Sequence, residues 1–213
     1  MPPPTKVRER SAREQILDAA VDRIATDGID EVRIARIAMD AGVSSSLVHY
    51  HFETREALLA EALEHSFELA GDVRIGAEED GRDAPSHARR LAAMVDHCLP
   101  YEGNLERDWM LWVELWLRAA RSPELRATAA RLYERMHRWL ADEIAAGIAA
   151  GEFTPCDVDA LTDRALALLD GYGVRALMRD SAIPLDRARA DVWRVLAGSL
   201  GLGGEIPPRS RAL

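Results

Sequence analysis

The stretch from Val32 to Glu56, VRIARIAMDAGVSSSLVHYHFETRE, constrains the fold of this chain more than any other. Up to Asp40 its apolar residues recur at the spacing of one face of a short helix. Gly42 then permits the positive φ that a helix C-cap or a tight turn requires. Ser44 is suited to cap a second short helix by accepting hydrogen bonds from its first backbone N–H groups. Two short helices joined by a glycine-containing turn predict a helix-turn-helix, whose second helix enters the DNA major groove.

The second helix of this motif has the side chains that DNA contact requires. Between Ala41 and Phe52 there is no Asp or Glu, although the chain carries 36 of them. Short hydroxyl groups and planar rings without negative charge can reach phosphates and base edges. With a basic residue near each end of the motif, the candidate DNA-binding residues are Arg33, Ser44, Ser45, Ser46, His49, Tyr50 and Arg55. The alternative is a helical hairpin of an unrelated α-protein, which the spacing alone does not exclude.

The same stretch resembles the N-terminal domain of the TetR (tetracycline-repressor-like) family of transcriptional regulators. The matching residues are Ile16 to Ala25, Gly28, Ile37-Ala38, Ala41-Gly42-Val43-Ser44, Tyr50, His51-Phe52 and Arg55. The chain departs from the family pattern where Val32 and Arg33 replace the usual Thr or Ser, at His49 in place of Tyr, and at Arg55 in place of Lys. These departures affect the expected DNA contacts more than the fold. The resemblance implies a DNA-binding domain followed by a helical body that binds a ligand and dimerises.

Ala, Leu, Arg and Glu dominate the composition and strand signals are scarce, which predicts an all-α protein. The chain has 213 residues, of which 48% are hydrophobic and 30% charged, as in soluble globular proteins. Cys98 and Cys156 show no metal or redox spacing, which indicates a reduced cytoplasmic chain without a cofactor. We expect no membrane partner, because no apolar run approaches the length of a membrane span and the N-terminus does not resemble a signal peptide.

Helical periodicity and capping residues predict about nine helices. We expect them over residues 11–26, 32–40, 45–52, 54–70, 86–99, 105–120, 123–150, 157–179 and 184–200. Thr54, Ser122 and Asp157 are expected N-caps, and Pro123 suits the first helical position. The stretch from Gly71 to Pro85 is rich in Gly, Asp and Glu and is expected to form a loop.

These elements suggest four segments. They are a disordered basic arm over residues 1–10, a helix-turn-helix DNA-binding domain over 11–53, a ligand-binding and dimerisation domain over 54–200, and a flexible tail over 201–213. The arm is either a solubilising tail or an additional DNA contact. The net charge of −9 does not exclude DNA binding, because a local positive surface from the arm, Arg33 and Arg55 is sufficient.

The helix expected over 105–120 carries Trp109, Trp112 and Trp116, three of the five Trp residues in the chain. Their spacing places them on one helical face, where they either fill the core or form the wall of a ligand site. Trp rings also attract cations, and the nearby Asp108 and Glu114 would suit one. The candidate ligand-binding residues are Met94, His97, Cys98, Trp109, Trp112, Trp116, Tyr133, Met136 and His137. The TetR resemblance implies an inducer site among these helices, and LWVELWLRAARSPELRA is similar to a regulatory-domain subtype also seen in betaine-responsive members.

The last two helices are apolar on more than one face, so they pack either within one chain or against a partner. The candidate dimer-interface residues are Leu161, Ala165, Leu168, Leu169, Tyr172, Val192, Trp193, Val195 and Leu196. The resemblance implies that these helices form a four-helix bundle with those of a second copy. Such a dimer would place its two recognition helices about 34–36 Å apart and would bind a palindrome.

Enzymatic readings find no support in the sequence. It contains no H-E-x-x-H, no glycine-rich phosphate loop and no nucleophile elbow, and His49 and His51 point to different sides of a helix. We therefore expect a homodimeric regulator, most simply a repressor released from a double-stranded DNA operator by an unidentified small molecule. The alternatives are an activator, an architectural DNA-binding protein, or a small-molecule binding protein with a vestigial helix-turn-helix.

Overall fold

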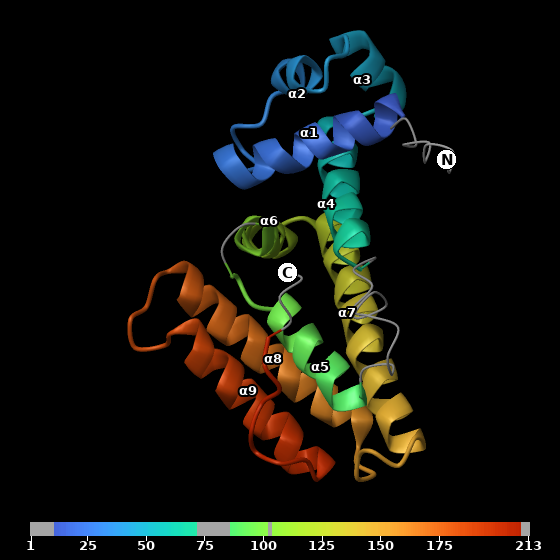
Figure 1. Cartoon of the computed structure of the whole chain (residues 1–213). Coiled ribbons are helices and arrows are strands. Elements are labelled where there is room, and N and C mark those ends of the chain that lie inside the picture. The colour runs from blue at the N-terminus through green and yellow to red at the C-terminus, as the bar shows by residue number, and fades with distance from the viewer. Residues whose placement is uncertain (1–10, 72–85, 102–103, 210–213) are drawn as a thin grey trace, which may run out of the picture. The chain divides into compact units, whose positions relative to one another are not determined.

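The computed structural model describes residues 11–71, 86–101 and 104–209, and this part of the chain contains nine helices and no strand (Figure 1). The prediction of an all-α fold is therefore confirmed. The helices fall into two compact units, Met1–Gly71 and Asp72–Leu213. The predicted basic arm, and the predicted loop after Gly71, lie outside the described residues.

The first unit holds four helices around one small core. They are α1 (Ala12–Asp27), α2 (Ile34–Asp40), α3 (Ser45–His51) and α4 (Arg55–Gly71). α1 packs against α4 and α2, and α2 packs against α3. The core residues are Ile16, Leu17, Ala20, Ile24, Ile37, Val48, Phe52, Leu58 and Leu63. Because helices of seven residues are unstable alone, α2 and α3 depend on this shared core.

The ends of these helices follow from local residues. Ser11 and Glu14 form a capping box, in which the Glu14 N–H donates to the Ser11 hydroxyl at 3.2 Å and the Ser11 N–H donates to the Glu14 carboxylate at 2.7 Å. Gly28 ends α1 at a φ of 75°. Before α4, the Ala57 N–H donates to the Thr54 hydroxyl at 3.0 Å, as predicted for an N-cap.

The second unit, hereafter the body, contains α5 (His87–His97), α6 (Asn104–Ala119), α7 (Pro123–Ala149), α8 (Val158–Leu177) and α9 (Leu185–Leu200). The long α7 packs against α5, α6 and α8, while α9 packs against α8 and α5 (Figure 1). Ser122 and Asp157 cap α7 and α8 through the backbone N–H groups of Leu125 and Ala160, as predicted. In the described part of the chain, no helix has the length and hydropathy needed to cross a membrane.

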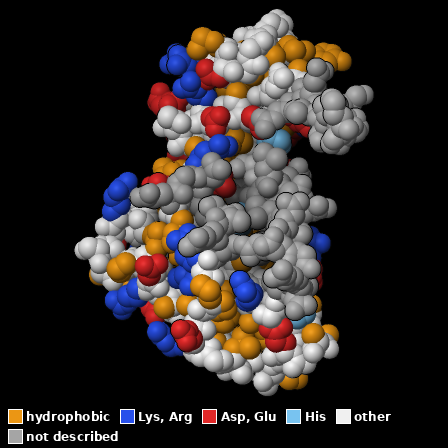
Figure 2. Space-filling model, viewed as in Figure 1, with side chains coloured by type: hydrophobic (Ala, Val, Ile, Leu, Met, Phe, Trp, Pro, Cys, Tyr) orange, Lys and Arg blue, Asp and Glu red, His pale blue; other side chains and the backbone are white. Residues whose placement is uncertain are grey.

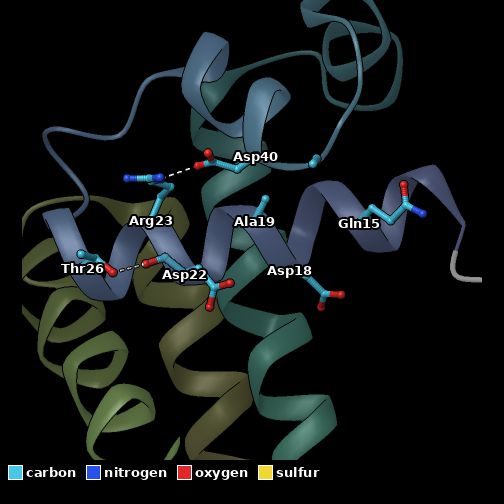
Figure 3. Close-up of a pocket in the computed structure, with 8 residues that line it drawn as sticks. Gln15, Asp18, Ala19, Asp22, Arg23, Thr26 and Asp40 are labelled. Atoms are coloured by element: carbon cyan, nitrogen blue, oxygen red, sulfur yellow. Dashed lines mark hydrogen bonds and ion pairs between the residues drawn. The ribbon is translucent and has the colours of Figure 1, made fainter.

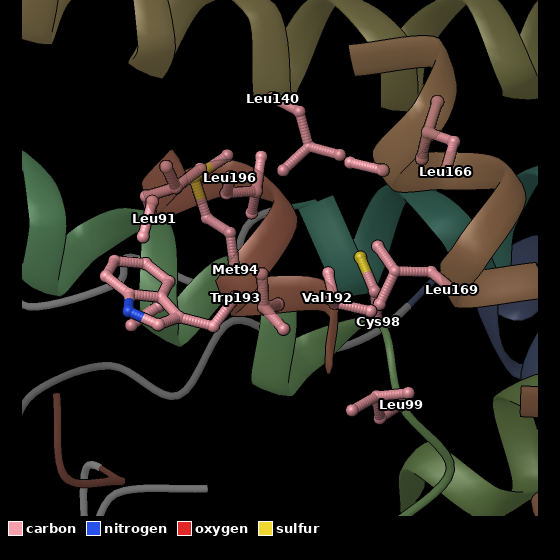
Figure 4. Close-up of a cluster of buried hydrophobic side chains, with 14 of the residues drawn as sticks. Leu91, Met94, Cys98, Leu99, Leu140, Leu166, Leu169, Val192, Trp193 and Leu196 are labelled. Carbon is pink, nitrogen blue, oxygen red and sulfur yellow. The ribbon is translucent and has the colours of Figure 1, made fainter. Parts of the chain in front are cut away.

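One apolar core joins α5, α7, α8 and α9 (Figure 4). A buried ion pair accompanies it, in which the Arg189 guanidinium on α9 donates to both carboxylate oxygens of Asp96 on α5. Arg189 also donates to the backbone carbonyl of Pro207 at 2.6 Å. Leu202 and Ile206 pack against the same core, so part of the segment expected to be a flexible tail contacts the body.

Candidate functional site

The turn between α2 and α3 has the geometry that the sequence predicts. Gly42 has a φ of 68°, and the Val43 N–H donates to the Ala38 carbonyl at 2.9 Å. Ser44 caps α3, because its hydroxyl accepts from the Leu47 N–H at 3.2 Å. The two short helices are thus joined by a tight turn, as in a helix-turn-helix unit.

α3 presents a polar and aromatic face to solvent. Ser45, Ser46, His49 and Tyr50 are exposed, and Tyr50 is 82% exposed. On the opposite side, Val48 is buried and holds α3 against its own unit. In Figure 2 the surface near α3 shows hydrophobic and uncharged side chains, in agreement with the absence of Asp and Glu from this helix. This face can approach the negative DNA backbone without charge repulsion.

Arg55 has a second role that the sequence did not indicate. Its Nε donates to the Val32 carbonyl at 3.0 Å, and Nη2 donates to the carbonyls of Ile29 and of Asp30, the latter at 3.2 Å. The half-buried guanidinium therefore fixes the connection between α1 and α2 to the start of α4. Its expected contact with DNA remains a prediction.

The other basic residues near the motif are more available. Arg33 is exposed and stands at the N-cap position of α2, where its side chain makes no capping hydrogen bond. Arg36 is exposed one turn later on the same helix and was not among the predicted DNA-binding residues. Its position three residues after Arg33 was the signal in the sequence that pointed to it.

A pocket of about 440 Å³ opens between α1 and α2 in this unit (Figure 3). It is lined by Gln15, Asp18, Ala19, Asp22, Arg23, Thr26, Asp40 and Ala41. The Arg23 guanidinium hydrogen-bonds the Asp40 carboxylate and lowers its pKa. Three aspartates make the lining unfavourable for phosphate, so we do not assign this pocket to DNA.

In the body, the three tryptophans of α6 contact one another through Trp116, and Trp112 also contacts Tyr133 of α7. The ring centroids of Trp109 and Trp112 lie 5.8 and 6.0 Å from that of Trp116, and those of Trp112 and Tyr133 lie 5.2 Å apart. The Trp109 indole N–H donates to the Cys98 carbonyl at 3.2 Å. Trp109 and Trp112 are buried, whereas Trp116 and Tyr133 are half-buried. We call Trp109, Trp112, Trp116 and Tyr133 the aromatic cluster.

The remaining candidate ligand-binding residues take other partners. Met94 is buried in the main core and Met136 packs against that core. The His97 ring contacts Trp139 edge-on at 5.9 Å, and burial lowers the pKa of His97. His137 faces the Asp163 carboxylate at 3.4 Å. The buried Cys98 thiol has its pKa raised to about 12 by burial, so it is inert at neutral pH.

Asp170 lies beside the aromatic cluster but was not among the predicted ligand-binding residues. It lies on α8, and its carboxylate accepts a hydrogen bond from the Tyr133 hydroxyl at 2.7 Å. Burial raises the pKa of Asp170, although the hydrogen bond from Tyr133 opposes this shift. Burial and this hydrogen bond also raise the pKa of Tyr133. No pattern within α8 indicates the pairing, because it depends on how α7 and α8 pack.

The candidate dimer residues divide into two groups. Most are buried in the core of their own chain: Leu161, Ala165, Leu169, Val192, Trp193 and Leu196. Leu168, Tyr172 and Val195 are only partly buried. Near them, an added Cβ at Gly171 or Gly198 would meet no atom within 4 Å. The surface left open on α8 and α9 therefore involves this second group of residues.

The described residues contain no group of three or more His, Cys, Asp or Glu side chains that could hold a metal ion.

Comparisons with known families cover both units. Residues 16–62 match the family described as bacterial regulatory proteins, tetR family. Residues 85–201, more than half of the chain, match the family described as BetI-type transcriptional repressor, C-terminal.

Individual relatives extend over most of the chain. The HTH-type transcriptional regulator BetI of Agrobacterium fabrum is 28% identical over 204 residues, covering 94% of this chain and 95% of the relative. A solved transcriptional regulator from Saccharomonospora viridis, in complex with choline, is 30% identical with a TM-score of 0.75, covering 89% of this chain and 97% of that one. A TetR-family regulator from Rhodococcus sp. is 28% identical with a TM-score of 0.71, covering 88% and 98%.

The helix-turn-helix geometry, the helical body and these matches agree on one assignment. The chain belongs to the TetR family of transcriptional regulators, and its body is of the BetI type.

Proposed function

We propose that this protein is a homodimeric repressor that binds a palindromic DNA operator and is released from it by a small molecule. The observation that carries the proposal is the exposed face of α3, which has no Asp or Glu and follows the tight turn at Gly42. The match of this unit to the TetR family supports the same function. Such a helix is suited to the major groove. A regulator of this kind acts in the cytoplasm, where its operator lies.

The DNA contacts divide into two kinds. We assign base contact to Ser45, Ser46, His49 and Tyr50, because they lie on the exposed face of α3. Ser44 and the arginines near the motif (Arg33, Arg36 and Arg55) are assigned to phosphates. The first group would set sequence preference, and the second would provide salt-dependent affinity.

The dimer would form through the open surface of α8 and α9. Leu168, Gly171 and Tyr172 of α8, with Val195 and Gly198 of α9, combine partly buried apolar side chains with glycines that leave room for close helix approach. A two-fold axis through this surface would pair identical patches. The buried members of the predicted set would support this surface from beneath.

The effector is proposed to be a small organic cation of the choline type. The Saccharomonospora viridis regulator, which is 30% identical to this chain, was solved in complex with choline. The aromatic cluster provides the flat, electron-rich faces that attract such a cation. Binding that favours one conformation of the dimer would shift operator affinity about five- to hundred-fold.

The test is selection of genomic DNA fragments by the purified protein at near-physiological salt, followed by operator binding with and without choline chloride. We expect enrichment of a palindrome and lower operator affinity with choline. Enrichment of DNA without sequence preference would instead indicate an architectural protein. Failure to enrich any sequence, while the dimer remains intact, would contradict the proposal.

A further inference from the structure

Asp170 brings a carboxylate to the aromatic cluster. It is half-buried on α8, and its carboxylate accepts a hydrogen bond from the Tyr133 hydroxyl. Among the described residues, no Lys, Arg or His forms an ion pair with it, and burial raises its pKa. Removing a carboxylate from water without a countercharge costs free energy. Such a group in a ligand-binding body is a candidate for function.

The surroundings of Asp170 suit one class of ligand. The Tyr133 hydroxyl donates to Asp170, and the Tyr133 ring contacts Trp112. Trp112 in turn contacts Trp116. Aromatic faces and a carboxylate together attract a cation. Cation–π attraction does not depend on hydrogen bonds, so the cation needs no N–H group. A quaternary ammonium group meets this requirement. Trp116, Tyr133 and Asp170 are only half-buried, so the cluster is not sealed from solvent.

A purely structural role explains less of this arrangement. The Tyr133–Asp170 hydrogen bond links α7 to α8, but the amide oxygen of an Asn at this position would accept the same bond without a buried charge. The negative charge therefore requires a separate explanation. A cationic ligand provides one, because it supplies the missing countercharge when it binds.

We infer that Asp170, Tyr133, Trp112 and Trp116 form the subsite that holds the cationic group of the effector. Asp170 provides the countercharge, and the rings of Trp112, Trp116 and Tyr133 provide cation–π attraction. The inference rests on the proposed function, because it assigns residues to the effector proposed there.

The experiment is calorimetric titration of the purified full-length protein with choline chloride and with 3,3-dimethylbutan-1-ol, a neutral molecule of nearly the same shape. We expect wild-type protein to bind choline at least tenfold more tightly than the neutral alcohol. Asp170→Asn should remove this preference by weakening choline binding at least tenfold. The matched control is Asp163→Asn, an exposed carboxylate on the same helix, which should leave both affinities unchanged.

Tyr133→Phe provides a second test that does not depend on the stability of the Asp170 variant. It removes the hydroxyl that competes for the carboxylate but keeps the ring, so choline affinity should be equal to or higher than that of wild type. A large loss in Tyr133→Phe would contradict the assignment of Asp170 as countercharge. Equal affinity of wild-type protein for choline and the neutral alcohol would also contradict it, as would equal choline binding by the Asp163 and Asp170 variants.

The two proposals fail separately in these measurements. Selective operator binding without any binding of choline would overturn the subsite and leave the DNA-binding function standing. Choline binding that depends on Asp170, in a protein that selects no DNA sequence, would overturn the proposed function and leave the subsite standing.

Discussion

The indole ring of Trp109 on α6 lies where a side chain at Gly173 on α8 would begin. A Cβ built on Gly173 would be 2.0 Å from Cη2 and 2.1 Å from Cζ2 of that ring, far closer than atoms can approach. Gly173 is therefore needed for the packing of α6 on α8. This contact sets the position of the aromatic cluster, because Trp109 also touches Trp116.

Gly173→Ala should destabilise the protein by about 1–3 kcal/mol, since the added methyl group overpacks a closed contact. Urea unfolding followed by circular dichroism measures the loss. Adding Trp109→Phe shortens the ring system and should recover part of it, giving a negative coupling in a double-mutant cycle. Additive losses in the double variant would show that the two residues do not interact.

Arg33→Ala and Arg55→Ala should differ in one respect. Both should weaken binding to all DNA sequences and reduce the slope of log affinity against log salt by about 1, if each contacts one phosphate. Only Arg55→Ala should also lower the thermal midpoint, because three backbone carbonyls lose their donor. A wild-type salt slope for Arg55→Ala, with reduced stability, would assign Arg55 to the fold alone.

Breaking the buried Asp96–Arg189 pair from one side should be costly. Asp96 and Arg189 side chains are 1% and 8% exposed, so Asp96→Ala leaves an uncompensated charge and should cost about 3–5 kcal/mol. Asp96→Leu combined with Arg189→Met should recover much of this loss, although the Pro207 carbonyl still lacks its donor. Denaturant unfolding of the wild-type protein and of both variants tests the order of stability.

The charge of Asp170 should make stability depend on pH. Its pKa is raised by burial, so between the ordinary Asp range and this raised value the folded protein binds a proton that the unfolded chain has lost. Stability from this group is therefore greatest at low pH and falls as pH rises through the raised pKa. Asp170→Asn cannot ionise, so its stability relative to wild type should increase with pH.

Unfolding free energies of both proteins between pH 4 and 7 measure this difference, since their other titrating groups are shared. A difference that stays constant with pH would show that Asp170 carries no unfavourable charge in the folded state. If Asp170→Asn is more stable than wild type and no longer binds choline, the Asp170 carboxylate lowers the stability of the folded protein in return for ligand recognition.

Local residues determined much of this protein. The caps at Ser44, Thr54 and Ser122 and the positive φ at Gly42 depend on atoms within one or two turns, and the sequence predicted each of them. The common face of Trp109, Trp112 and Trp116 likewise follows from the period of a single helix. Helix number and order, and the exposed face of α3, are determined at this level.

Tertiary structure decided which helices meet and therefore which side chains become partners. Asp170 joins Tyr133 across 37 positions of the chain, and Arg55 reaches the carbonyls of Ile29 and Val32 across the α1–α2 connection. The sequence pattern of α8 and α9 fits both an intrachain core and a dimer surface. Periodicity identifies an apolar face but does not identify what covers it. Only packing within the folded chain separates the buried Val192 from the partly open Val195.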